Sequence, residues 1–182
     1  KPILKQIIKE SLEDEYKEKL LTIFKSGDHQ YAIELSKQVG MKDFLVGAIL
    51  IDVNLSGANL SGANLYDVYL SSANLIDTIL KGANLKGASL SSAYLGDADL
   101  SSANLKGADL HISSLEDADL SGADLSYSYL KGANLKGANL KGADLEWADL
   151  SGADLSGADL YGADLTNIKY DKSTVWPEGF KP

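Results

Sequence analysis

The side chains that could carry out catalysis are few and scattered. The chain has two histidines, His29 and His111, which lie far apart in the sequence, and it has no cysteine. Neither histidine belongs to a recognisable Ser–His–Asp arrangement or has a Cys partner. The 17 Gly residues recur at turn positions and do not precede a helix, as a phosphate-binding loop requires. We therefore expect no enzymatic activity, no cofactor and no metal, with both histidines as ordinary cap or surface residues.

The charged residues narrow the classes of partner. The chain has 26 Asp and Glu against 17 basic residues, all of them Lys, so it carries a formal charge of −9. Without Arg it lacks the planar, bidentate group that proteins use on phosphates. No apolar run reaches the roughly 20 residues that span a bilayer, and Lys1–Glu10 is too charged for a signal peptide. We expect no direct nucleic-acid binding, no membrane binding and a cytoplasmic location; because the chain opens on Lys1 and not Met, a leader upstream is compatible with the sequence.

A five-residue repeat dominates the chain. From Leu45 to Leu165 every fifth residue is Leu, over 25 positions, usually with Ala two residues before it and Asn or Asp between them. On an α-helix, steps of five would spread these leucines around every side. On a straight strand, successive leucines would point to opposite faces. A short extended piece followed by a bend keeps all of them inside, and we infer that each repeat has this form.

The bends coincide with the two residues after each Leu. Gly often occupies the second of these positions, as in Gly57 and Gly62, which suits a turn with positive φ. Other residues occupy it in some repeats, and they predict that the turn type varies along the chain: Asp77, Ser92, Tyr127 and Trp147.

The tandem Ala-(Asn/Asp)-Leu-x-x pattern resembles the pentapeptide-repeat family. The resemblance implies a right-handed quadrilateral β-helix with four repeats per coil, so that residues 20 apart lie on successive coils. The 25 repeats would then form about six coils, and at about 4.8 Å per coil a rod roughly 30 Å long. We assign this mainly β solenoid to residues 44–168. Its interior is expected to be filled by leucine side chains.

The two ends differ from the repeat, and a solenoid needs a cap at each end. Residues 1–43 have helical apolar spacing and form the predicted N-terminal cap, with stripes at Leu4, Ile7, Ile8 and Leu12 and at Leu20, Leu21, Ile23 and Phe24. Ser11 would cap a second helix, and a third would run from Asp28 to Val39 and end at Gly40. Val46, Ile49 and Ile51 suggest that the helices pack on the first coil. Residues 169–182 resemble the aromatic tails of cyanobacterial family members and would seal the other end. The N-terminal cap is expected to be structural, with partner binding as the alternative.

A period of 20 turns the sequence into a map of the outer surface. Six carboxylates fall close together on about three coils, where they would form a partner surface or a weak divalent-cation site: Asp77, Asp97, Asp99, Glu116, Asp117 and Asp119. The alternative is that Asp is simply the preferred outward residue, which keeps the solenoid soluble.

A second surface is aromatic. Tyr127 and Trp147 share a column, and Tyr129 lies two residues from Tyr127. Exposed aromatic side chains are typical interface anchors, although these could instead stack at a corner without any partner. The column of Asn64, Asn84 and Asn104 is expected to form a structural side-chain ladder.

These features favour a non-enzymatic, rigid protein-interaction or scaffold module, monomeric, with an unknown protein partner. The alternative is an acidic DNA mimic that binds a DNA-handling enzyme, as in the gyrase-interacting branch of the family. Its charge of −9 fits that alternative. Against it, those members dimerise through a C-terminal element, whereas only 17 residues follow Leu165, and Lys residues dilute the acidic surface.

Overall fold

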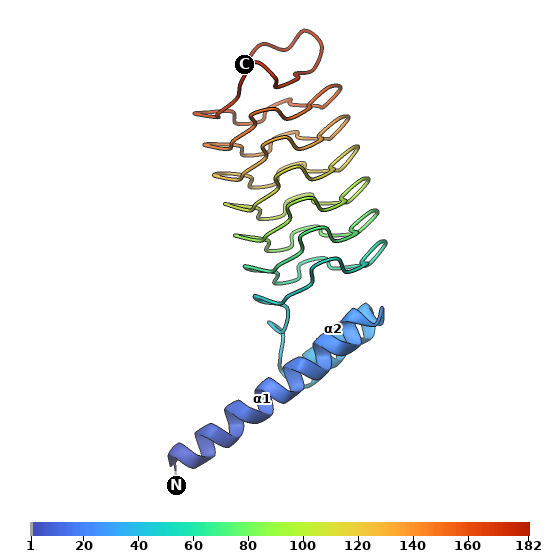
Figure 1. Cartoon of the computed structure of the whole chain (residues 1–182), viewed down its shortest axis with the longest axis vertical. Coiled ribbons are helices and arrows are strands. Elements are labelled where there is room, and N and C mark those ends of the chain that lie inside the picture. The colour runs from blue at the N-terminus through green and yellow to red at the C-terminus, as the bar shows by residue number, and fades with distance from the viewer. Residues whose placement is uncertain (1) are drawn as a thin grey trace.

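The protein is a stack of coils with a helical hairpin below it. The computed structural model describes residues 2–182, with side chains from Ser11 onward. Helix α1 (Pro2–Lys25) and helix α2 (His29–Gln38) lie at one end, and α1 extends beyond the width of the coils (Figure 1). The C-terminal tail forms a loop at the opposite end (Figure 1). Within the described residues, no helix is long and apolar enough to cross a membrane.

Single-residue parallel bridges between positions 20 apart hold the coils together. One column runs through Ile49, Tyr69, Ser89, Asp109, Tyr129, Asp149 and Lys169. Between two coils, Leu50 N donates to Tyr69 O at 2.8 Å and Tyr69 N donates to Ala48 O at 2.9 Å. Four such columns close each coil, which confirms the right-handed quadrilateral β-helix that the repeat predicts.

The repeated leucines form the core. Leu55, Leu65 and every further repeat leucine through Leu155 are at most 1% exposed, and most of the alanines two residues earlier are also buried. Each buried Leu contributes about 1.5–3 kcal/mol of transfer free energy before chain entropy is counted. The interior is therefore occupied by side chains, as the sequence predicts.

The corners all use one backbone conformation. Gly at the second corner position has φ from +63° to +72°, and the non-Gly residues at the same position have φ from +52° to +61°. Asp77, Ser92, Tyr127 and Trp147 belong to this second group. The prediction that the turn type varies between repeats was therefore wrong. The coil fixes the corner, because stacking at a 20-residue period leaves no room for a different turn, and the side chain must accept a left-handed backbone.

The helices cover the first coil through aromatic contacts. Phe24 meets Phe44 edge-on with ring centroids 5.9 Å apart, and it meets His29 at 4.9 Å. Burial in this contact lowers the pKa of His29. Ile49 and Ile51 are 62% and 50% exposed, so they do not carry the helix packing that the sequence suggested.

The helix boundaries correct one further prediction. Ser11 does not cap a second helix, because α1 continues through it without a break to Lys25. The helix predicted to begin near Asp28 is α2, and Gly40 ends it with φ of +77°. Gly40 N donates to Lys37 O and Met41 N donates to Ser36 O, the hydrogen bonds of a Schellman motif. The side chains of the predicted stripe residues Leu4, Ile7 and Ile8 lie outside the described part of the chain, whereas Leu12 is half exposed.

The C-terminal tail continues the last coil before it folds over the end. Lys169 and Val175 bridge to Asp149 and Asp154. Trp176 packs on the core, edge-on to Tyr170 and stacked on Phe180 with centroids 5.3 Å apart. These three rings are the ones that the sequence places at this end.

Buried hydroxyls at alanine positions generate a stability prediction. Ser113 and Ser128 are each 1% exposed; Ser113 Oγ donates to Leu110 O at 2.7 Å, but Ser128 Oγ has no hydrogen-bond partner. An unpaired buried hydroxyl costs about 1–3 kcal/mol. Ser128→Ala should therefore raise the free energy of unfolding by about 1 kcal/mol in urea titration, and Ser113→Ala should give no gain. Equal effects of the two substitutions would contradict this assignment.

Candidate functional site

The acidic surface lies along one corner of the coil and the wall beside it. Asp77, Asp97 and Asp117 are exposed corner residues, each with φ of +57°. Asp99 bridges to Asp119 on the next column. The structure thus brings the six predicted carboxylates onto one edge, as the period of 20 indicates.

Half of these six carboxylates already have partners within the fold. Asp99 Oδ1 accepts hydrogen bonds from Ser101 N and Ser101 Oγ at 2.9 and 2.6 Å, and Asp119 Oδ1 accepts from Ser121 N at 2.9 Å. Asx bonds of this kind fix the corner that follows. Glu116 pairs with Lys136 at 3.3 Å. Within residues 11–182, whose side chains are described, no group of three or more His, Cys, Asp or Glu is placed to hold a metal ion.

The aromatic surface has a different character. Tyr127 and Trp147 stack with ring centroids 6.4 Å apart and an interplanar angle of 14°. They remain 49% and 52% exposed. The Lys106 ammonium lies 5.0 Å from the Tyr127 ring centroid, within cation–π range. Three successive coils therefore present Lys106, Tyr127 and Trp147 as one stack, which we name the aromatic corner.

The wall beside the aromatic corner carries the predicted Tyr129 and also His111, which the sequence analysis did not place in this surface. Tyr129, 52% exposed, stacks on His111 with centroids 5.9 Å apart. His111 Nδ1 lies 2.5 Å from Asp109 Oδ1. His111 was expected to be an ordinary surface residue, and its place in this stack follows from its being 18 residues before Tyr129, close to one full coil. The 20-residue period could have revealed it, as it could have placed Lys106 below Tyr127.

The acidic and aromatic surfaces are on opposite edges of the rod. Asp117 and Tyr127 are ten residues apart, which is half of a 20-residue coil. The structure therefore brings together the members of each surface, but it does not join the two surfaces into one site.

Backbone strain marks the aromatic corner and one residue near it. Ile112, Tyr127 and Trp147 have φ of +56°, +60° and +61°. Left-handed backbone costs an L-residue about 1–2 kcal/mol, and Asn and Asp tolerate it better than branched or bulky residues. These three side chains are at least 49% exposed, so burial does not offset the cost. The coil imposes this backbone at every corner, so it is the choice of bulky side chains at these positions that points to a constraint other than folding.

One ion pair lies beside the aromatic corner. Lys169 Nζ is 2.8 Å from Asp149 Oδ2, and Asp149 Oδ1 accepts from Ser151 N at 3.0 Å. Burial acts to raise the pKa of Asp149, but the hydrogen bonds from Lys169 and Ser151 outweigh it and lower that pKa to about 2. The carboxylate form is therefore favoured by folding.

The fold and the repeated corners define a pentapeptide-repeat β-helix protein. The family model described as pentapeptide repeats matches in 8 copies, with matched stretches between residues 48 and 167. The chain belongs to this family.

Solved structures of other repeat proteins are similar to this chain. A pentapeptide-repeat protein (Rfr23) from the cyanobacterium Cyanothece 51142 is 31% identical, over 83% of this chain and 99% of that one, with a TM-score of 0.40. HetL from the cyanobacterium Nostoc sp. strain PCC 7120, involved in heterocyst differentiation regulation, is 27% identical over 81% of this chain and 97% of that one, with a TM-score of 0.38. QnrB1, a plasmid-mediated fluoroquinolone resistance protein, is 18% identical over 72% of this chain and 87% of that one, with a TM-score of 0.42. No curated protein sequence matches the chain.

The strained corner at Ile112 can be tested directly. Ile112→Gly should raise the free energy of unfolding by about 1 kcal/mol, because Gly adopts the left-handed corner freely and this relief exceeds the greater chain entropy that Gly loses on folding. Ile51→Gly is the matched control: Ile51 is also exposed at a corner, but its φ is not positive. There Gly should lower the free energy of unfolding by about 0.5–1 kcal/mol. A loss of stability in both variants would show that the Ile112 corner is not strained.

The Asp149–Lys169 pair predicts a pH dependence. The pKa of Asp149 is lower in the folded chain than in the unfolded chain, so its contribution to stability is complete above about pH 4 and is lost as the pH falls towards 2. Asp149→Asn should flatten that part of the stability profile, as measured by urea unfolding at about pH 5 and about pH 2.5. An unchanged profile in this variant would contradict the assignment.

Proposed function

We propose that the protein is a rigid, non-enzymatic protein-interaction module that binds its partner through the aromatic corner. The observation that carries this proposal is the exposed stack of Tyr127 on Trp147 at two corner positions where most repeats have Gly. Large aromatic side chains in left-handed backbone reduce stability, and half of their surface faces solvent. Interface anchors have this character, because they gain their energy only when a partner covers them.

The wall next to the aromatic corner indicates the chemistry of the partner. Asp124, Asp144 and Asp164 form one column of successive bridges, directly before the corner residues in the chain. In each of them, Oδ1 accepts a hydrogen bond from the backbone N–H of the residue two positions later, at 2.9–3.0 Å. Asp124 and Asp144 are half-buried and Asp164 is exposed on this wall. A partner surface with Lys or Arg side chains fits both features, through ion pairs and through cation–π contacts.

The proposal is compatible with what the rest of the chain offers. The two histidines are apart: His29 packs on Phe24 in the cap, and His111 lies on the outer wall. The predicted acidic surface around Asp97 and Asp117 stays a second candidate contact face, although Asp99, Asp119 and Glu116 within it already have structural partners. The aromatic corner has no comparable structural explanation.

Affinity capture with matched variants tests the proposal. The double substitution Tyr127→Gly and Trp147→Gly should abolish recovery of the partner while the coil keeps its circular-dichroism spectrum. Tyr161→Ser is the control, because Tyr161 is 83% exposed at a corner position outside this stack. A third variant, Asp97→Asn with Asp117→Asn, probes the acidic edge. Loss of the partner only in the third variant would move the site to the acidic surface, and retention in all three would overturn the proposal.

The acidic DNA-mimic function is the second candidate, favoured by the charge of −9 and the carboxylate columns. Ion pairs weaken it, because Lys136, Lys141 and Lys169 lie against Glu116, Asp159 and Asp149 at 3.3, 2.9 and 2.8 Å. Inhibition of DNA supercoiling by gyrase at micromolar protein would support the DNA mimic. Absence of inhibition would remove it and leave the interaction module unaffected.

A further inference from the structure

The first coil has an edge that the helical cap does not fill. One coil higher, Ile79 N donates to Ala58 O at 2.9 Å and Ile79 O accepts from Leu60 N at 2.7 Å, so both backbone groups pair with the coil below. Asn59 is the equivalent residue of the first coil. Among residues 2–182, no backbone hydrogen bond reaches Asn59 N or Asn59 O.

The unpaired edge continues around the next corner. Lys81 O accepts from Gly62 N at 2.9 Å, whereas Ser61 O, its counterpart one coil lower, has no backbone donor within the described chain. Open edges of this kind can accept a further strand. Asn59 N is therefore available as a donor, and Asn59 O and Ser61 O are available as acceptors. These three groups have the spacing of the backbone groups that join each coil to the next.

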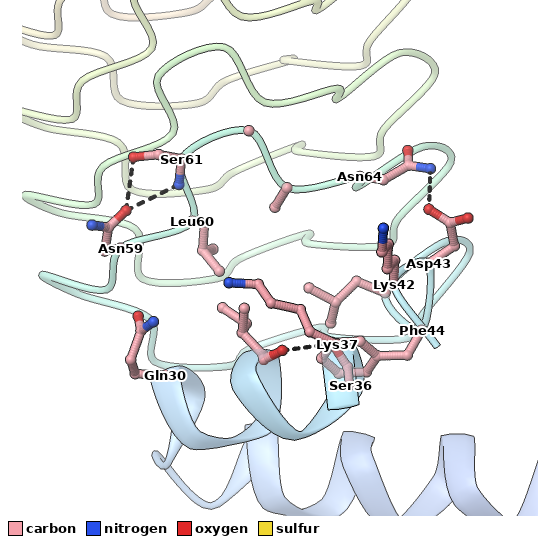
Figure 2. Close-up of a pocket in the computed structure, with 14 residues that line it drawn as sticks. Gln30, Ser36, Lys37, Lys42, Asp43, Phe44, Asn59, Leu60, Ser61 and Asn64 are labelled. Atoms are coloured by element: carbon pink, nitrogen blue, oxygen red, sulfur yellow. Dashed lines mark hydrogen bonds between the residues drawn. The ribbon is translucent and has the colours of Figure 1, made fainter. Parts of the chain in front are cut away.

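A cleft of about 660 Å³ lies directly below this edge. Helix α2 contributes Gln30 and Lys37 to its lining, the segment after α2 contributes Lys42 and Asp43, and the first coil contributes Asn59 and Ser61 (Figure 2). The Lys37 side chain extends towards Leu60 across this space (Figure 2). The cleft therefore has a backbone edge on one side and a helix on the other.

The charge of the cleft differs from that of the coils. Residues 1–43 hold eight Lys and eight acids, which leaves nine Lys and eighteen acids for the rest of the chain. Of the charged lining residues, Lys37 and Lys42 outnumber Asp43, and Asp43 Oδ1 accepts from Asn64 Nδ2 at 2.7 Å. Glu34 reaches Lys37 only at 3.6 Å, an exposed pair of the kind that contributes little. The lining of the cleft therefore has one Lys more than it has acids, whereas the rest of the chain is acidic.

We propose that the cleft binds an extended acidic segment of a partner protein, which adds to the first coil as a parallel strand. Its backbone pairs with Asn59 and Ser61 as a further coil would, and its carboxylates meet Lys37 and Lys42. This is strand addition, in which backbone bonds supply affinity and flanking side chains supply specificity. The site is separate from the aromatic corner. Because α2 lines it, the helical cap gains a binding role besides covering the core.

Peptide titration tests this site. The probe is acetyl-Val-Glu-Val-Glu-Val-amide, with fluorescence anisotropy of a labelled copy as the readout. It should bind the full chain with a Kd below about 1 mM. The version with Lys in place of Glu, and the acidic version with alternate backbone nitrogens methylated, should each bind about tenfold more weakly or not at all.

Protein variants separate the cleft from other surfaces. Lys37→Glu with Lys42→Glu should weaken the acidic peptide about tenfold, whereas Lys131→Glu with Lys172→Glu, on a distant coil and in the C-terminal tail, should leave binding unchanged. An equal Kd for the acidic peptide and for its Lys-containing or N-methylated version would overturn the proposal. The absence of binding at about 1 mM peptide would also overturn it. A concentration-dependent dimer in sedimentation, abolished by the Lys37/Lys42 variant, would show that a second copy and not a foreign segment occupies the edge.

Discussion

One backbone constraint underlies this structure: every fifth residue of the solenoid turns a corner in left-handed conformation. Gly and non-Gly corner residues share nearly the same φ, from +52° to +72° across the coils. That uniformity lets position i lie under position i + 20 on every wall, and the bridges, the leucine core and the surface columns all depend on it. A corner with another turn would shift the following leucines out of the core, at a cost of about 1.5–3 kcal/mol for each. The residues at the corners must therefore adapt to the coil.

The same constraint directs function to the outside of the rod. The interior is filled by Leu and Ala, so specificity can arise only from wall, corner and end residues. At the corners, Asp tolerates the left-handed backbone better than a bulky residue does, and Asp67 and Asp117 lie against Gly87 and Gly137 of the next coil, where a Cβ would collide with them. Tyr127 and Trp147 have no such compensation apart from their mutual stacking, which is worth about 0.5–1.5 kcal/mol when well packed. Together with Ile112 at the next corner, they are the corner residues least explained by folding, and the pair of stacked rings is the reason that we place the interaction surface there.

The sequence was sufficient for the fold and for the surface columns, because a strict repeat makes local pattern and long-range contact the same information. Leu45 to Leu165 predicts the core, and the period of 20 predicts the pairing of Asp99 with Asp119, the stack of Tyr127 on Trp147 and the hydrogen bond from Asn84 to Asn64 at 2.9 Å. Outside the repeat, the sequence predicted the helix boundaries and the cap contacts less well. Ser11 has the type of a helix cap, but residues that favour a helix on both sides carry α1 through it without a break. The exposed Ile49 and Ile51 and the open edge at Asn59 depend on where the cap ends relative to the first coil, which no periodicity encodes.

The most direct measurement of the central claim is the free energy of unfolding of Gly142→Trp. Gly142 occupies a corner with φ of +63°, and a Cβ placed there would meet no atom within 4 Å, so any effect reports on the backbone and not on a clash. Its neighbours one coil below and above are also glycines, Gly122 and Gly162, and the substitution is combined with Tyr161→Ser to remove the exposed ring beside Gly162 on which the new side chain could stack. If the coil imposes the left-handed corner, the variant should keep its circular-dichroism spectrum and lose about 1–2 kcal/mol. Unchanged or increased stability would contradict the account, because Trp147 would then sit at its corner without strain and its exposure would no longer need a partner to explain it.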